Sequence, residues 1–118
     1  MPSHELKFEL KVHKELEMDL FMLENTVLVK DGKSQSFASA PSNDGNYVEF
    51  HGTGQIRHNG QVDLLGFASG TAGFAWEAKI MVIVNGEAKE FLNSPIRCRT
   101  DRNGRADLKD VSLTWPAV

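Results

Sequence analysis

Residues 6–22 read LKFELKVHKELEMDLFM, and apolar side chains alternate with charged ones through most of this stretch. The apolar positions of one parity are Leu6, Phe8, Leu10, Val12, Leu16, Met18, Leu20 and Met22. A period of two is that of a β-strand, whereas a helix would need apolar positions three to four residues apart. The stretch therefore predicts β-structure with one apolar face.

One continuous strand over these residues would be about 55 Å long at roughly 3.3 Å per residue, which is too long for so small a domain. The chain must turn, and a three-residue loop at His13-Lys14-Glu15 keeps the parity on both sides. We therefore expect a hairpin in which Val12 faces Leu16 and both strands share one apolar face.

Five Asp-Gly or Asn-Gly pairs follow, and these residues tolerate the positive φ angles of tight hairpin turns. The pairs are Asp31-Gly32, Asp44-Gly45, Asn59-Gly60, Asn85-Gly86 and Asn103-Gly104. Turn signals between alternating runs predict an all-β fold of about 8–10 short antiparallel strands. We expect a two-sheet β-sandwich, and the alternative is a small closed β-barrel of the lipocalin or allene-oxide-cyclase kind.

The turn at Gly104 also predicts a strand register. A three-residue loop closed by this glycine would place Asp101 opposite Arg105 and Arg99 opposite Asp107. Opposite charges would then meet on one face, which favours this pairing.

Three further segments carry information on topology. A loop closed by Gly60 would place Ile56 opposite Val62. Residues 66–73 are small and rich in glycine, which predicts a bend between sheets or a close approach of two backbones. Residues 74–84 are apolar on one face throughout and on both faces at the far end, which predicts a central strand.

Residues 100–106 read TDRNGRA and resemble a hairpin common in bacterial immunoglobulin-like and prealbumin-like adhesion domains, which often carry a Thr-Asp-x-Asn-Gly turn. The resemblance covers seven of the 118 residues and is mostly turn chemistry. It implies a sandwich fold and says little about function.

The totals fit a single domain over residues 1–118, with 41% hydrophobic and 25% charged residues. A net charge of −3 argues against a nucleic-acid partner. No apolar run approaches the ~20 residues of a membrane helix, and residues 1–12 hold no signal-peptide core. Cys98 is the single cysteine, so an intrachain disulfide is impossible and a cytoplasmic location is favoured.

No catalytic constellation is evident, and the four histidines lack the close spacing of metal ligands. We therefore expect a non-enzymatic binding or interaction module without a metal or cofactor. The alternatives are a small-molecule-binding or enzymatic barrel and a self-assembling structural subunit.

A row of polar residues is the first candidate site. Tyr47, Glu49, His51 and Arg57 share the polar parity of one strand and combine an aromatic ring with charges of both signs. Such a row can bind a carbohydrate or a protein ligand. The alternative is an ordinary solvent-facing strand.

Two further groups suggest contacts with partners. Arg97, Arg102 and Lys109 form a basic patch for an anion or an acidic partner, unless they only solvate a sheet edge. Phe21 and Leu23 lie off the main apolar parity, which predicts a contact in a symmetric homodimer. The competing interpretation is that a loop of the same chain covers them.

Overall fold

The computed structural model describes residues 3–57 and 62–116, which form eleven strands and no helix. The strands are β1 (Ser3–His13), β2 (Leu16–Leu23), β3 (Thr26–Lys30), β4 (Lys33–Ser34), β5 (Ser42–Asp44), β6 (Tyr47–Arg57), β7 (Val62–Gly70), β8 (Ala75–Val84), β9 (Glu87–Glu90), β10 (Ile96–Arg99) and β11 (Arg105–Leu113). Three of them, β4, β5 and β9, are short strands of two to four residues. These short strands explain why the total exceeds the 8–10 strands predicted. Among these described residues there is no helix long and apolar enough to cross a membrane.

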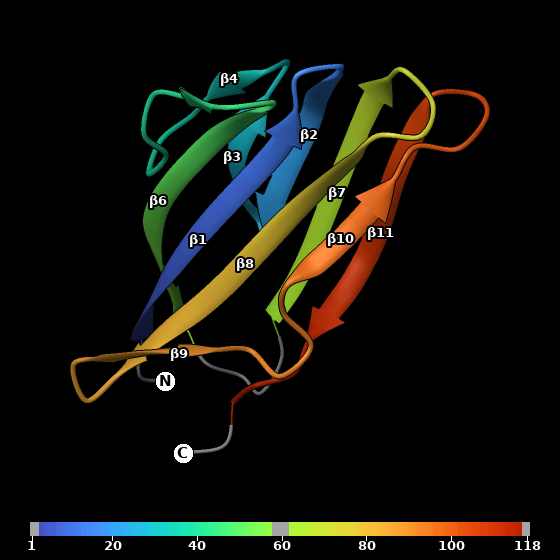
Figure 1. The fold of residues 1–118 in the computed structure, drawn as a ribbon. Helices are drawn as coiled ribbons and strands as arrows, with labels where there is room; N and C mark the ends of the chain where they lie inside the picture. The colour runs from blue at the N-terminus through green and yellow to red at the C-terminus, as the bar shows by residue number, and fades with distance from the viewer. Residues whose placement is uncertain (1–2, 58–61, 117–118) are drawn as a thin grey trace.

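The strands form two antiparallel sheets that pack face to face (Figure 1). Sheet A has the order β10-β8-β1-β6-β5, with β9 also paired to β8, and sheet B has the order β11-β7-β2-β3-β4. Each order begins and ends on an edge strand, so neither sheet closes on itself. The predicted two-sheet sandwich is confirmed, and the closed-barrel alternative is wrong.

The first two strands are not the predicted hairpin. β1 pairs with β6 and β8 in sheet A, whereas β2 pairs with β3 and β7 in sheet B. The turn at Lys14-Glu15 is therefore an arch, meaning a turn that carries the chain from one sheet to the other (Figure 1). The two apolar faces do not lie side by side but face each other across the core. An arch and a hairpin impose the same alternation on the sequence, because in both cases one face of each strand is buried.

The predicted register around Gly104 fails for the same reason. Arg99 lies opposite Ala75 in sheet A, and Asp107 lies opposite Phe67 in sheet B, so the two charges do not pair. Only the turn itself keeps the expected pairing, since the Asp101 N–H donates to the Arg105 carbonyl at 2.9 Å.

The hairpin expected around Gly60 is also absent, because β6 belongs to sheet A and β7 to sheet B. Ile56 pairs with His4 instead of Val62. The turn residues 58–60 lie outside the described part of the chain.

Three of the five Asp-Gly or Asn-Gly pairs lie at hairpin turns, one of them Asp44-Gly45 between β5 and β6, and the other two turns have positive φ at both central residues. Asp31 and Gly32 have φ angles of 51° and 75°, and they connect β3 to β4. Asn85 and Gly86 have φ angles of 52° and 81°, and they connect β8 to β9. Positive φ at both central residues is the mark of a type I′ turn, whose twist matches that of the flanking strands.

Three arches meet at one end of the sandwich (Figure 1). They connect β1 to β2, β7 to β8 and β10 to β11. The Gly70 N–H donates to the Gly104 carbonyl at 2.9 Å, and the Thr71 N–H donates to the Glu15 carbonyl at 3.1 Å. A Cβ atom on Gly70 would collide with the Glu15 carbonyl oxygen. The end of this segment agrees with both predictions, because residues 71–73 bend between the sheets and Gly70 approaches another backbone closely, whereas residues 66–70 belong to strand β7.

Thr100 stabilises the same end of the sandwich through hydrogen bonds to the backbone. Its side chain is buried, its hydroxyl donates to the Thr71 carbonyl at 2.8 Å, and the hydroxyl oxygen accepts from the Phe74 N–H at 3.1 Å. A buried polar group is stable only when it is hydrogen-bonded. The hydroxyl satisfies two backbone groups of the arch between β7 and β8.

Trp76 on β8 spans the core between the sheets. Its ring is fully buried, and its Nε1–H donates to the Ala106 carbonyl of β11 at 2.9 Å. Space for the ring exists because Gly66 on β7 has no side chain, and a Cβ there would lie 2.6 Å from the ring atom Cη2. β8 lies inside sheet A, which confirms the central strand predicted for residues 74–84.

A bulge in β2 corrects the prediction for Phe21 and Leu23. Pairing with β7 shifts between Met18 and Leu20, so that the parity of the strand reverses after Asp19. The exposed fractions of Phe21 and Leu23 are only 0% and 4%, because both now point into the core of their own chain. They therefore cannot form the homodimer contact, and the homodimer itself stays a prediction without these residues.

We predict that Gly66→Ala lowers the free energy of unfolding by about 1–3 kcal/mol, because the new methyl group would overlap the Trp76 ring. Gly54→Ala on β6 is the matched control, since a Cβ there meets nothing within 4 Å. This control should be neutral or slightly stabilising, by up to about 1 kcal/mol. Urea denaturation of both variants measures the difference, and equal midpoints would contradict the packing at Gly66.

Candidate functional site

The outer face of sheet A carries most of the predicted polar row. Tyr47, Glu49 and His51 on β6 lie opposite His13, Lys11 and Glu9 on β1, respectively. Since paired residues point to the same side of a sheet, these six side chains cover one outer surface. The sequence thus placed three of its candidates correctly on a common face.

On this outer face of sheet A, positively and negatively charged side chains alternate and form ion pairs. The Lys11 Nζ atom lies 3.3 Å from a Glu49 carboxylate oxygen, and the Lys79 Nζ atom lies 3.9 Å from Glu9. The His51 ring lies between the two carboxylates, 3.8 Å from each. The hydrogen bond that the Lys11 ammonium donates to Glu49, and then the negative charge of Glu49, raise the pKa of Lys11. Glu49 and His51 are therefore engaged with neighbours of their own chain.

Arg57 lies apart from this group. Its backbone pairs with Ser3 at the far end of β6, ten residues from Tyr47. At roughly 3.3 Å per residue the two positions are about 33 Å apart, so Tyr47 and Arg57 cannot contact one small ligand.

The predicted basic patch is divided between the two sheets. Arg97 is on β10 in sheet A, Arg102 is in the arch that follows, and Lys109 is on β11 in sheet B. The sequence placed all three on one hairpin that does not form. Arg97, Arg102 and Lys109 therefore do not lie together on a single hairpin.

The fold instead brings Arg97 near Tyr47, which the sequence assigned to a different site. Both line a hollow of about 170 Å³ on the outer face of sheet A. The rest of its lining comes from Lys11 on β1 and from Ala75, Trp76 and Glu77 on β8. We call this the outer hollow.

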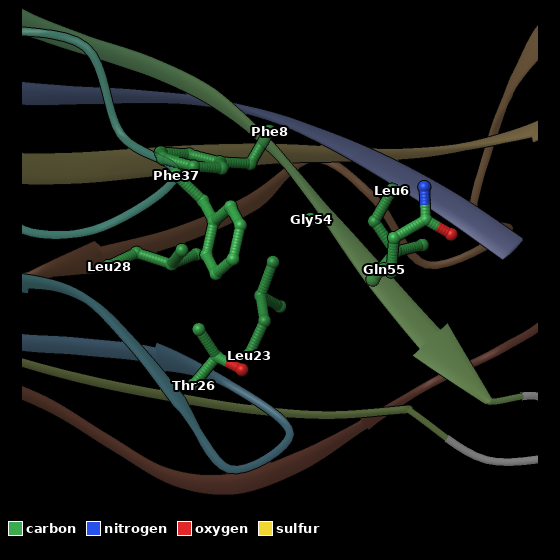
Figure 2. A pocket seen from close by; sticks show the side chains of 8 residues that line it. All are labelled: Leu6, Phe8, Leu23, Thr26, Leu28, Phe37, Gly54 and Gln55. Atoms are coloured by element: carbon green, nitrogen blue, oxygen red, sulfur yellow. The ribbon is translucent and has the colours of Figure 1, made fainter. Parts of the chain in front are cut away.

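A second, apolar pocket opens between the two sheets at the edge formed by β6 and β3 (Figure 2). We call this the edge pocket, and its volume is about 90 Å³. It is lined by Leu6, Phe8, Leu23, Thr26, Leu28, Phe37, Gly54 and Gln55. None of these side chains is ionisable, and five of the eight are large and apolar.

A strap over residues 35–39 closes part of this edge. The Gln35 N–H donates to the Leu28 carbonyl in sheet B at 2.9 Å, and the Ser39 N–H donates to the His51 carbonyl in sheet A at 2.7 Å. Between them Phe37 has a φ of 70°, which is rare for a residue with a bulky side chain.

The strained residue is also an exposed part of the pocket wall. The exposed fraction of Phe37 is 62%, although its ring points toward the side chains of Leu23 and Leu28 (Figure 2). Unfavourable backbone conformations of this kind concentrate at ligand-binding positions. A strained and exposed aromatic residue in its wall makes the edge pocket a candidate binding site.

Two glycines lie on the inner face of β6 at this edge, and one of them, Gly54, lines the pocket. At Gly52 a Cβ would collide with the Phe37 carbonyl oxygen and would lie 2.5 Å from the Phe8 ring, so glycine is needed for packing. At Gly54 a Cβ would meet nothing within 4 Å in the part of the chain that the structure describes, so the missing side chain leaves open space there.

The edge pocket is not apparent from the sequence alone. The available signals were two glycines at inward positions of an alternating strand and an isolated phenylalanine in the polar segment SQSFASAP. Glycine inside a strand often marks a place where a ligand or another backbone approaches. Without the tertiary fold, however, nothing relates Phe37 to β6.

Among the described residues no cluster of three or more His, Cys, Asp or Glu side chains could hold a metal ion. Comparison of the chain with models of protein families, with curated proteins and with solved structures finds no match. The case for a function therefore rests on the geometry of the two sites.

We predict that Glu49→Gln lowers the pKa of the Lys11 ammonium toward its ordinary value, because Glu49 supplies the hydrogen bond and the largest charge effect that raise it. Glu77→Gln is the matched control and should shift this pKa less, since Glu77 contributes only a weak charge effect. NMR titration of the Lys11 side chain measures both values. Equal shifts in the two variants would contradict the dominant role of Glu49.

Proposed function

We propose that the protein is a non-enzymatic binding module whose edge pocket takes a branched aliphatic side chain of a protein partner. The observation that carries this proposal is an apolar pocket with an open mouth, in which Gly54 leaves space that none of the described residues fills. The lining holds no ionisable group, which favours binding over acid–base or nucleophilic chemistry.

The size of the pocket supports an aliphatic group as the occupant. Its volume of about 90 Å³ is smaller than the roughly 150 Å³ of an apolar cavity that binds benzene. A valine, leucine or isoleucine side chain gains about 1.5–3 kcal/mol when it is fully buried. Such a gain is too small for tight binding, so the rest of the partner must add contacts outside the pocket.

The strap shows how an extended segment can lie at this edge. Residue 38 forms an isolated antiparallel bridge with Gly52, and the Thr53 N–H donates to the Phe37 carbonyl at 3.1 Å. The segment thereby adds to β6 and directs one apolar side chain to the mouth of the pocket. Addition of a strand with alternate side chains in pockets is a common mode of peptide recognition.

We predict that N-acetyl-leucinamide shifts the backbone amide NMR signals of Gly54, Thr26 and Leu28, with weak, millimolar affinity. N-acetyl-alaninamide is the matched probe and should produce much smaller shifts, because its methyl group leaves the pocket mostly empty. Equal shifts from the two probes would contradict binding in the pocket.

Gly54→Val is the decisive variant, because its Cβ would meet no described atom within 4 Å and its two methyl groups would occupy space of the pocket. We expect it to keep the wild-type unfolding midpoint or a higher one and to lose the response to the leucine probe at least tenfold. An unchanged response would overturn the proposal. A wild-type dimer in light scattering that Gly54→Val dissociates would replace the protein partner with a second copy of the chain.

A further inference from the structure

We infer that the outer hollow is a second site, separate from the edge pocket, and that it binds one pyranose ring of a neutral carbohydrate. The hollow lies on the outer face of sheet A, where β6, β1, β8 and β10 are neighbours (Figure 1). The edge pocket lies between the sheets and involves the other end of β6, so a ligand in one site does not occupy the other.

Tyr47 provides a fixed aromatic wall for the hollow. Its ring meets the His13 ring edge-on with a centroid distance of 5.3 Å, and His13 in turn packs on Phe74 at 4.2 Å with an angle of 33°. The exposed fraction of Tyr47 is 37%, so part of the ring remains accessible. An aromatic ring held in one orientation offers an apolar surface to the C–H face of a sugar at little cost in side-chain entropy.

The hollow has room because the residue between its walls is small. This residue is Ala75 on β8. The next residue, Trp76, lies opposite Val12 of β1, and Val12 precedes His13, which pairs with Tyr47. The volume of about 170 Å³ is well below the roughly 300 Å³ at which sites for drug-sized ligands begin. One ring with its substituents in solvent suits this space better than a larger ligand.

Glu77 and Arg97 provide an acceptor and a donor on adjacent strands. They lie directly opposite each other in the register of β8 and β10. Within the described part of the chain, however, neither side chain makes an ion pair with the other or with a neighbour. A hydroxyl group both donates and accepts, so two adjacent hydroxyls can satisfy the carboxylate and the guanidinium together.

The charge balance favours a neutral ligand over an anion. Lys11 is paired with Glu49 at 3.3 Å, and the charge of Arg97 is balanced by Glu77 opposite to it. These two carboxylates offset the two cations of the lining, which weakens the attraction of the hollow for a phosphate or a carboxylate. An aromatic wall with convergent donors and acceptors is the chemistry that a sugar requires.

The test uses the intact protein and methyl glycosides of glucose, galactose, mannose, xylose and N-acetylglucosamine. At least one should show saturation-transfer NMR signals at its ring C–H protons and should shift the amide signals of Ala75 and Glu77. Tyr47→Ala should weaken binding of that glycoside at least tenfold, whereas Tyr47→Phe keeps the stacking surface and should bind within about threefold of the wild type. Thr53→Ala, on the same strand but outside the hollow, should bind like the wild type.

Three results would overturn this inference. They are the absence of a response to all five glycosides, wild-type binding by a folded Tyr47→Ala variant, and amide shifts caused by phosphate or acetate in place of a sugar. Gly54→Val should bind the glycoside normally, so loss of function in the edge pocket and in the outer hollow can be told apart.

Discussion

The packing of the Trp76 ring against Gly66 is the constraint on which the arrangement of the two sheets depends. The ring belongs to sheet A, yet its only polar atom bonds to the Ala106 carbonyl in sheet B at 2.9 Å. Because the hydrogen bond and the absence of a Cβ at Gly66 both require one position of the ring, they fix how β8 lies over β7 and β11. The arches at one end then hold this alignment through backbone hydrogen bonds among Glu15, Thr71 and the two glycines 70 and 104.

The alternation in the sequence was enough to predict the fold class but not the path of the chain. Periodicity identifies which side chains face a core, and this held for Leu6 to Val12 on β1 and for Trp76 to Val82 on β8. It does not say whether the next strand lies beside the first or across the core from it, because both positions bury the same face. The opposite charges of Arg99 and Asp107 suggested a hairpin, although charged residues on the outer faces of two sheets produce the same pattern.

The candidate sites were predictable only where they followed one strand. Tyr47, Glu49 and His51 share a face because they share a parity, and this needed no tertiary information. The bulge at Asp19 reversed the parity that had placed Phe21 outside, and the sequence hides this reversal because residues 20–23 are all apolar and show no alternation. The association of Tyr47 with Arg97 depends on the order of four strands in sheet A, which the sequence analysis did not derive.

The two glycines of β6 show how one strand can serve both structure and binding. Gly52 is occupied from both sides, by the Phe8 ring and by the backbone of the strap, so it is required for the closure of the edge. At Gly54, two residues further along the same face, a Cβ would meet no atom of the described residues within 4 Å, and the position lines an apolar gap. A gap of this kind weakens the fold, since a side chain that fits it would add buried contacts. Its position directly beside a strained and exposed phenylalanine is more consistent with a site kept open for a ligand than with an imperfection of packing.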